Sequence, residues 1–299
     1  MSSWTFESIP DQTHRTAIVT GANTGIGFET ARQLALKGAQ VVLACRNPDK
    51  AQAAVDRILA EKADAAVSIG QLDLSDLDNI AAFASRIRDH HAGIDLLILN
   101  AGVMVPPASK TAQGFELQFG VNHLGHFALT GHLLPLLRAQ PGARVVAVSS
   151  LAALRGQMDF EDLQFEKRGY QPWPAYGQSK LANLLFIREL QRRLDAAGAD
   201  IKVTAAHPGW TATDLQRTST VYRILNPFLA MKPPQGALPT LRAATDPAAN
   251  GADYFGPGGF MQARGYPVRI DMNDRAQSPK DASRLWQVSE RLTGVGYGL

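Results

Sequence analysis

The stretch that decides the fold is Thr20-Gly21-Ala22-Asn23-Thr24-Gly25-Ile26-Gly27. It follows an apolar run at residues 16–19 and precedes a segment with Ala31, Leu34 and Ala35 at helical spacing. Glycines allow close backbone approach, and the N-terminus of a helix offers amide donors and the positive end of its dipole. We therefore predict a strand, a turn and a helix that cradle a diphosphate, with a plain tight turn as the alternative.

The same order of elements repeats along the chain. Five more apolar runs, each followed or preceded by an amphipathic segment, are predicted as strands at residues 41–44, 67–69, 96–99, 145–148 and 202–205. Such continuous apolar strands are typical of a parallel sheet covered by helices on both faces. No linker rich in Pro, Gly or Ser divides the chain. We predict an α/β fold in which residues 1–299 form one domain, a doubly wound parallel sheet of the Rossmann type.

Two long segments interrupt this alternation. Residues 154–174 are predicted as an insertion, and residues 214–234 as a lid, because long loops in compact domains usually serve function. Large apolar side chains occur in or beside them, which indicates an apolar substrate pocket: Trp173, Trp210, Tyr222, Ile224, Leu225, Phe228 and Met231. Packing in the core or between subunits is the alternative.

Composition narrows the class of protein. Apolar types make up 45% and charged types 19% of 299 residues, which excludes a disordered chain. The net charge of +3 comes from scattered residues without a basic stripe, so nucleic-acid binding is not expected. A single cysteine, Cys45, requires no oxidising compartment. We find no signal peptide or apolar run of membrane-spanning length, and expect a cytoplasmic protein without a membrane anchor.

The glycine spacing carries a family resemblance. Thr-Gly-x-x-x-Gly-x-Gly departs from the usual dinucleotide fingerprint and resembles the motif of the short-chain dehydrogenase/reductase family, and the resemblance extends from about residue 16 to 209. It implies a nicotinamide dinucleotide and hydride transfer between that cofactor and a carbonyl or alcohol carbon. The glycine-rich turn contributes Gly21, Asn23, Thr24, Gly25, Ile26 and Gly27 to cofactor binding. Further contacts implied by the resemblance are Asp73 and Leu74 at the adenine, Asn100, Ala101 and Gly102 against the sheet, and Pro208, Gly209, Thr211 and Thr213 at the nicotinamide or phosphates. For Asp73, helix capping is the alternative.

The choice of dinucleotide follows from the end of the second strand. An acidic residue there favours NAD by hydrogen bonding to the ribose, but this chain has Ala44-Cys45-Arg46. The guanidinium of Arg46 presents a planar set of donors that can pair with a 2′-phosphate. We predict NADP(H) in preference to NAD, with Arg46 as a solvent-facing charge being the alternative.

Tyr176 and Lys180 are spaced to share one face of a helix. A free phenol titrates near ~10, and a cation ~5 Å away at an effective dielectric of ~20 favours the phenolate by about 3 kcal/mol, or ~2 pK units. That brings Tyr176 toward the range of a general acid/base near neutral pH. Ser149 and Ser150 follow the strand at 145–148, at the edge where open parallel sheets bind ligands.

The resemblance assigns roles to these residues. It implies Ser150 as the catalytic serine, Tyr176 as the acid/base, Lys180 as its cationic partner and a ribose contact, and Asn122 as the helix residue that positions Lys180 through water. Ser149 competes with Ser150, because the insertion roughly doubles the usual gap between serine and tyrosine. His207, before Pro208, is expected to be structural.

We therefore predict an NADP(H)-dependent oxidoreductase acting on a small-molecule carbonyl or alcohol. Three features are similar to the retinol-dehydrogenase branch of the family: the insertion, the chain's ending and the Ser-Lys-Leu-Ala-Asn-Leu-Leu-Phe helix at 179–186. Protochlorophyllide reductases are near relatives of this branch.

The family implies a homodimer or homotetramer built through the long helices, with a monomer as the alternative. A rival class is a nucleotide sensor or scaffold that keeps the fold without turnover. No metal site is predicted, because no carboxylate or thiol lies near His123, His126 and His132 to complete a ligand set.

Overall fold

The computed structural model describes residues 3–211 and 231–299, and its centre is one sheet. Eight strands form it in the order β3-β2-β1-β4-β5-β6-β7-β8. β1 to β7 run parallel and β8 pairs antiparallel with β7. This confirms the predicted doubly wound α/β class. The strands are β1 (Thr16–Thr20), β2 (Gln40–Cys45), β3 (Val67–Gln71), β4 (Leu96–Leu99), β5 (Ala143–Val148), β6 (Ile201–Ala206), β7 (Tyr254–Pro257) and β8 (Pro267–Ile270).

The strand register brings the carboxyl ends of the central strands to one edge. Val19 is level with Ile98, Ile98 with Val146, and Val146 with Thr204. From β1 the chain moves outward to β2 and β3, and then returns to β4 on the other side of β1. Open α/β sheets bind ligands at such a switch point. The topology therefore points to the space above the ends of β1 and β4.

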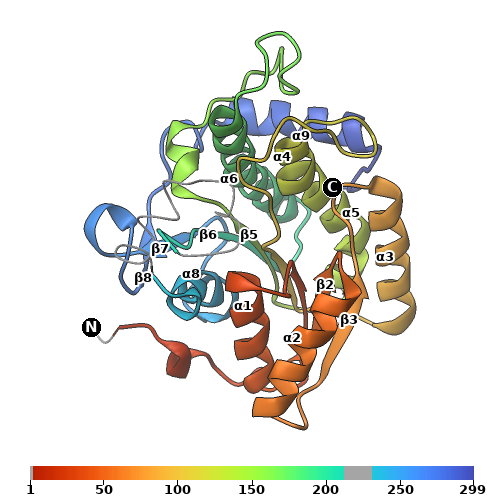
Figure 1. Ribbon diagram of the computed structural model, residues 1–299, viewed down its shortest axis with the longest axis vertical. Coiled ribbons are helices and arrows are strands. Elements are labelled where there is room, and N and C mark those ends of the chain that lie inside the picture. The colour runs from red at the N-terminus through yellow and green to blue at the C-terminus, as the bar shows by residue number, and fades with distance from the viewer. Residues whose placement is uncertain (1–2, 212–230) are drawn as a thin grey trace.

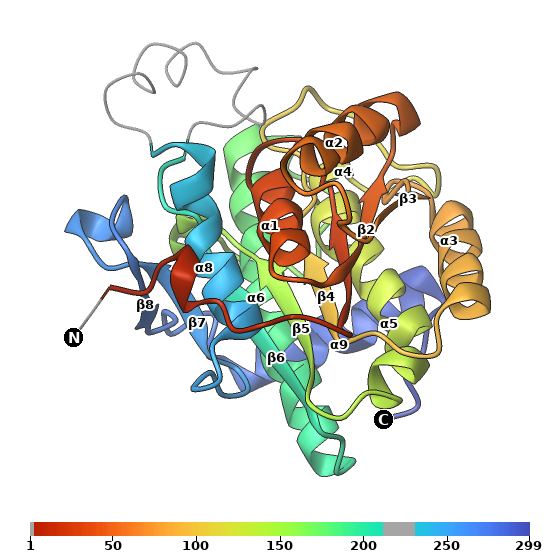
Figure 2. The ribbon, with the colours of Figure 1, turned by 90° about the horizontal axis from the view of Figure 1, so that it is seen from below.

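Helices cover both faces of the sheet, as Figures 1 and 2 show. Along β4, Leu96 and Ile98 face one hydrophobic core, whereas Leu97 and Leu99 face the other. This alternation follows from the two-residue period of a strand, which makes a strand between two helix layers apolar throughout. The first core packs against α1 (Gly25–Leu36), α2 (Pro48–Glu61) and α8 (Pro233–Thr245), and the second against α3 (Leu77–His90), α5 (Gly125–Arg138) and α6 (Pro172–Ala196).

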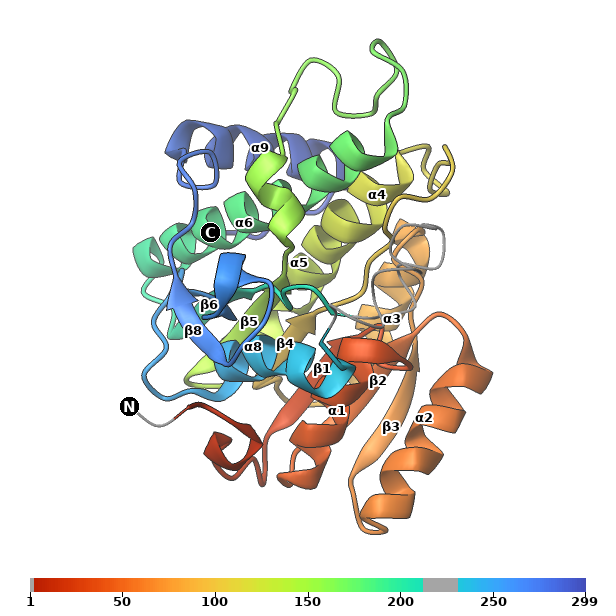
Figure 3. The same cartoon turned by 60° about the vertical axis from the view of Figure 1, so that its left-hand side comes forward.

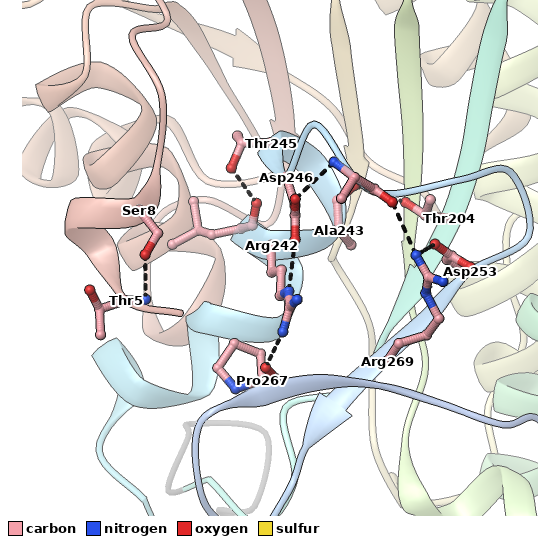
Figure 4. A network of polar contacts seen from close by, with 12 residues as sticks. Thr5, Ser8, Thr204, Arg242, Ala243, Thr245, Asp246, Asp253, Pro267 and Arg269 are labelled. Atoms are coloured by element: carbon pink, nitrogen blue, oxygen red, sulfur yellow. Dashed lines mark hydrogen bonds and ion pairs between the residues drawn. The ribbon is translucent and has the colours of Figure 1, made fainter. Parts of the chain in front are cut away.

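The last two strands were not predicted from the sequence. β7 is the short run Tyr-Phe-Gly-Pro, and glycine and proline are both poor strand residues. Polar contacts hold this edge to α8 (Figure 4). Arg242 Nη1 donates to the Pro267 carbonyl at 2.5 Å, and Arg269 pairs with Asp253 at 2.8 Å. The sheet edge thus depends on long-range pairs that no local pattern reveals.

The helical segment at residues 117–138 is interrupted by a π-helical turn. It comprises α4 (Leu117–Phe119), one π-helical turn η2 (Gly120–Leu124) and α5. π-helical turns are rare and often occur at functional sites. The predicted insertion at 154–174 spans the end of the short helix η3 (Leu151–Arg155), an irregular stretch and the first residues of α6. In the irregular stretch the Asp162 carboxylate accepts three backbone N–H groups. Residues 214–230 of the predicted lid at 214–234 lie outside the described residues, and its last residues include the start of α8. The remaining short helices are η1 (Phe6–Ser8) and η5 (Phe260–Gln262).

The C-terminal helix α9 (Pro279–Thr293) lies across α5 and α6, as Figure 3 shows. Its Trp286 is fully buried and stacks on Phe186, with ring centroids 6.1 Å apart. Trp286 also meets Phe127 and Tyr297 edge-on, with ring centroids 5.1 and 4.5 Å away.

No helix among the described residues combines the length and apolar character required to cross a lipid bilayer.

Replacing Trp286 with alanine tests this packing. Because the indole is 1% exposed and contacts three aromatic rings, we expect Trp286→Ala to lower the free energy of unfolding by about 3–5 kcal/mol. Urea denaturation provides the measurement. Trp173→Ala is the control, because that side chain is 44% exposed and its loss is expected to cost under about 1 kcal/mol. Equal losses in the two variants would contradict the assignment of α9 to the core.

Candidate active site

Two turns above the switch point are joined through Thr20. Its Oγ1 accepts the backbone N–H groups of Asn100 and Ala101, each at 2.9 Å. The Asn100 side chain forms a second bond to the same residue: its Nδ2 donates to the Thr20 carbonyl at 2.8 Å. The predicted glycine-rich turn after β1 and the predicted Asn-Ala-Gly turn after β4 therefore form one polar unit.

The glycines of the first turn have a packing role that the sequence interpretation did not anticipate. Gly21 has φ +66°, and a β-carbon there would lie 3.0 Å from the Ala101 Cα. A β-carbon at Gly27 would collide with the Asn100 amide and with the Gly21 carbonyl. These two positions are thus closed to side chains by the neighbouring turn of the protein. Gly25, with φ +58°, begins α1, whose first amides face the predicted diphosphate position.

The other predicted nucleotide contacts surround this turn. Arg46 is exposed directly after β2, and Gly21 N–H donates to the Ala44 carbonyl at 2.8 Å, so Arg46 and the glycine-rich turn are near neighbours. Asn23 and Ile26 lie within that turn and at the start of α1, partly exposed and buried respectively, and Thr24 is exposed. Asp73 accepts from Ser75 N–H and Oγ–H, while its neighbour Leu74 is buried. Asp73 thus organises its own turn, and Asp76 is the residue that caps α3.

Lys180 is a buried cation on α6. The residue is 4% exposed, and its Nζ donates to the Val148 carbonyl at the end of β5, 2.9 Å away. Burial lowers the pKa of Lys180 to about 8, because removal from water disfavours the charged form. The amine therefore titrates close to the physiological range, unlike a lysine at the surface.

Tyr176 lies one turn earlier on the same helix, as the spacing predicts. The Nζ of Lys180 is 5.8 Å from the centroid of the Tyr176 ring. The Tyr176 residue is buried, and Trp173 packs edge-on against it with centroids 6.3 Å apart. The structure thus brings phenol and amine together at the carboxyl edge of the sheet.

The two candidate serines are in different environments. Ser149 is buried, and its Oγ donates to the Lys180 carbonyl at 2.8 Å. Ser150 is partly exposed and caps η3, accepting the Ala152 N–H at 3.2 Å. The proton of the Ser149 hydroxyl is thus used within the fold, whereas the Ser150 hydroxyl retains a donor. This difference favours Ser150 for contact with a ligand.

Ser150 stays close to Tyr176 despite the insertion. η3 packs directly on α6, where a β-carbon at Gly156 would collide with the Gly177 carbonyl and one at Gly177 would lie 3.1 Å from the Ala152 carbonyl. Gly177 follows Tyr176 in sequence. The additional residues therefore form a loop outside this contact and do not separate the serine from the tyrosine.

Asn122 lies in the π-helical turn and clamps the loop after Gly102. Its Oδ1 accepts the Val103 N–H at 2.8 Å, and its Nδ2 donates to the Val103 carbonyl at 3.0 Å and to Ser179 Oγ at 2.9 Å. A β-carbon at Gly102 would be 3.0 Å from Asn122 Oδ1 and 3.6 Å from Lys180 Nζ. Asn122, Lys180 and the Asn-Ala-Gly turn thus meet at Gly102.

The Pro208-Gly209 turn closes the site beyond β6. His207 is buried, and burial lowers its pKa to about 4, so the ring is neutral. Its Nδ1 accepts the Gly209 N–H at 3.1 Å, which fits the expected structural role. Gly209 has φ +64°, and the Thr211 hydroxyl donates to the Pro208 carbonyl at 2.7 Å. Thr213 lies outside the described residues.

The histidines considered for a metal site diverge. His123 contacts Ser289 on α9, whereas His126 contacts Thr20, and His132 is partly exposed on α5. Within residues 3–211 and 231–299, no three His, Cys, Asp or Glu side chains gather as metal ligands.

Comparison with known proteins identifies the family. The family model described as short chain dehydrogenase matches residues 15–221. The chain belongs to the short-chain dehydrogenases. It is 44% identical over 287 residues to mouse retinol dehydrogenase 12, covering 95% of this chain and 87% of that protein. Human retinol dehydrogenase 13 is 42% identical over 292 residues, covering 94% and 85%. The predicted retinol-dehydrogenase-like branch is thereby confirmed.

Solved structures agree with this placement. An uncharacterised protein from Mycobacterium paratuberculosis is 42% identical, covers 100% of both chains and has a TM-score of 0.84. A protein from Shigella flexneri complexed with NADP is 26% identical, covers 82% of this chain and 97% of that one, and has a TM-score of 0.65. As a short-chain dehydrogenase, this protein is an oxidoreductase that uses a nicotinamide cofactor and acts on alcohol or carbonyl groups.

The depressed pKa of Lys180 has a consequence for stability. The unfolded chain keeps this amine protonated up to ~10.5, whereas the folded chain releases the proton near 8, so folding is favoured as pH rises between these values. The free energy of unfolding should rise by about 2 kcal/mol from this group alone between roughly pH 8 and 10. Urea titrations of wild type and Lys180→Met at both pH values measure it, and parallel behaviour of the two proteins would disprove the shift.

Proposed function

We propose that this short-chain dehydrogenase is an NADP(H)-dependent oxidoreductase in which Tyr176 is the general acid/base. Two observations support the proposal: the Tyr176–Lys180 pair meets Asn122 at Gly102, and η3, which Ser150 caps, packs on α6 beside Tyr176. These side chains come from α6, the end of β5 and the π-helical turn. All of them lie at the carboxyl edge of the sheet, where the fold binds ligands.

The chemistry follows from the roles these residues can fill. When bound, NADPH supplies the hydride for reduction of a carbonyl, and NADP⁺ accepts it in the reverse direction. The Ser150 hydroxyl donates to the substrate oxygen and orients the carbonyl. The Tyr176 hydroxyl gives its proton to that oxygen, and the Lys180 ammonium stabilises the phenolate that remains. In alcohol oxidation the phenolate takes the proton back.

Lys180 is suited to a second contact. An ammonium has three N–H donors, and the Val148 carbonyl uses one of them. The donors directed away from β5 suit the hydroxyls of the nicotinamide ribose, as the family resemblance implies. Lys180 would then hold the cofactor and tune the tyrosine from one position.

The preference for NADP(H) rests on Arg46. The residue is exposed directly after β2, two positions beyond the Ala44 carbonyl that binds the glycine-rich turn, and no carboxylate takes its place there. The relatives from Shigella flexneri and Escherichia coli were solved with NADP and NADPH, respectively. A guanidinium pairs well with a 2′-phosphate and offers no acceptor for the ribose hydroxyls of NAD.

The substrate is expected to be bulky and apolar. Leu154 on η3 and Trp173 on α6 are 55% and 44% exposed, and they flank Ser150 and Tyr176 in the chain. Large exposed apolar side chains beside a site indicate contact with an apolar ligand. The names of the relatives specify retinol, which is an alcohol of this kind.

Association through the long helices is not expected in this protein. α9 occupies the outer sides of α5 and α6 and buries Trp286 against Phe127 and Phe186. A homodimer or homotetramer using those faces would have to displace α9 and expose this core. We therefore propose a monomer, or association through another surface.

Removal of one oxygen atom tests the acid/base role. We expect Tyr176→Phe to lower kcat for reduction of a bulky apolar carbonyl with NADPH by about 10²- to 10⁴-fold, because the proton donor is lost. NADPH binding, followed by the fluorescence of the nicotinamide, should change little. Tyr266→Phe, at an exposed tyrosine, is the control and should match wild type. A wild-type protein that binds NADPH but reduces no carbonyl in a broad panel would instead support the sensor alternative.

Cofactor choice is tested at Arg46. Loss of a charge-assisted contact worth about 1.5–3 kcal/mol should raise the KM for NADPH about 10- to 100-fold in Arg46→Ala. The KM for NADH should change by less than about threefold, because no 2′-phosphate is present. Arg291→Ala, which removes an exposed arginine on α9, controls for net charge. Equal effects on both cofactors would refute the assignment.

A further inference from the structure

His126 is a buried histidine in the first turn of α5 that the proposed mechanism does not use. The residue is 2% exposed, and burial lowers its pKa to about 3, with a smaller contribution from the charge of Lys180. The ring is therefore neutral, with one N–H donor and one acceptor nitrogen. Both ring nitrogens have partners, Thr20 at the start of the glycine-rich turn and Asn122 in the π-helical turn.

The partners fix the tautomer. His126 Nδ1 lies 3.1 Å from the carbonyl oxygen of Asn122, which can only accept, so Nδ1 carries the proton. Nε2 is then an acceptor, and it lies 2.9 Å from Thr20 Oγ1. The Thr20 hydroxyl must therefore donate to His126.

The bonds at Thr20 agree with this direction. Its oxygen already accepts two N–H groups, from Asn100 and Ala101, which leaves its single proton to be donated. The acceptor on His126 at 2.9 Å is closer than the Ile98 carbonyl at 3.3 Å. Each bond in the chain from Asn100 through Thr20 and His126 to Asn122 thus has one donor and one acceptor.

These hydrogen bonds close a ring on the side of the site where the cofactor is expected. The backbone carbonyl of Asn122 accepts the His126 N–H, and the Asn122 side chain is hydrogen-bonded to both the N–H and the carbonyl of Val103. Val103 follows the Asn100-Ala101-Gly102 turn, which is bound to Thr20 at its other end. His126 is the member of the ring that links the glycine-rich turn to the π-helical turn.

We propose that His126 is a positioning residue that fixes the Asn-Ala-Gly turn and Asn122 relative to the glycine-rich turn through its Nδ1–H tautomer. The inference rests on the proposed function, since the ring borders Gly102 and Lys180, where the nicotinamide ribose is expected. Small displacements of such positioning elements reduce turnover far more than they reduce stability.

A matched pair of histidine variants tests the role. His123, three residues earlier, is equally buried and also neutral, with its pKa lowered to about 3 by burial. His123 lies in the π-helical turn itself, but its Nε2 contacts Ser289 on α9, away from the glycine-rich turn and the Asn-Ala-Gly turn. We expect His126→Phe to lower kcat/KM for carbonyl reduction about 10- to 100-fold and to weaken NADPH binding, and His123→Phe to stay within about threefold of wild type in both. Thermal unfolding should show similar losses for the two variants.

Substitution at Thr20 tests the same link from its other end. Thr20→Ser keeps the hydroxyl and should retain near wild-type kcat/KM, whereas Thr20→Val should lose as much as His126→Phe. The kcat/KM of the double variant Thr20→Val/His126→Phe should be little lower than that of either single variant, because both substitutions remove the same hydrogen bond. The comparison of Thr20→Val with Thr20→Ser alone still tests the link if His126→Phe fails to fold.

The outcomes separate the inference from the proposed function. Equal effects of His126→Phe and His123→Phe, or additive effects in the double variant, would overturn the role of His126 while wild-type activity upholds the function. A wild-type protein that neither binds NADPH nor reduces a carbonyl would overturn both.

Discussion

The site depends on one contact, the hydrogen bond from the Lys180 ammonium to the Val148 carbonyl at the end of β5. Burying a charge costs several kcal/mol unless strong partners compensate it. Further hydrogen bonds between α6 and the end of β5 hold the lysine in this position. Ser149 donates to the Lys180 carbonyl, and Asn183 donates to the same Val148 carbonyl at 3.3 Å. The position of Tyr176, one turn before Lys180, follows from this attachment.

A network of neutral groups surrounds the buried amine. Asn122, Ser179, Thr20 and His126 are hydrogen-bonded to one another or to the backbone of the neighbouring turns. Neutral donors and acceptors hold these turns in place without adding a second charge that would neutralise the ammonium. The protein thereby keeps Lys180 electrostatically available to the tyrosine and to a ligand.

The sequence was informative wherever a side chain and its neighbours in the chain determine the outcome. Continuous apolar runs located β1 to β6, and the i,i+4 spacing placed Tyr176 and Lys180 on one face of α6. β7 and β8 were missed, because long-range pairs such as Arg242 with Pro267 hold this edge of the sheet. The π-helical turn was also missed, and the partners of its Asn122 are Val103 and Ser179, which are distant in the chain. The part played by His126 was also missed, since its partner Thr20 is far away in the chain.

The glycine-rich turn shows how one pattern can have two causes. The sequence interpretation explained Gly21 and Gly27 by the approach of a diphosphate, but β-carbons at both positions would also meet Asn100 or Ala101. The serine question was likewise undecidable from spacing. It depends on which hydroxyl is bound to the backbone of α6, and Ser149 is the one so bound.

The central claim is that Lys180 makes the Tyr176 phenol ionise more readily than a free tyrosine. Its most direct test is the pH titration of tyrosinate absorbance in the complex with NADP⁺, taken as the difference between wild type and Tyr176→Phe. We expect this one phenol to titrate well below the ordinary value of ~10, and Lys180→Met to raise its pKa. Titration at or above that value, unchanged by Lys180→Met, would show that Lys180 does not activate Tyr176.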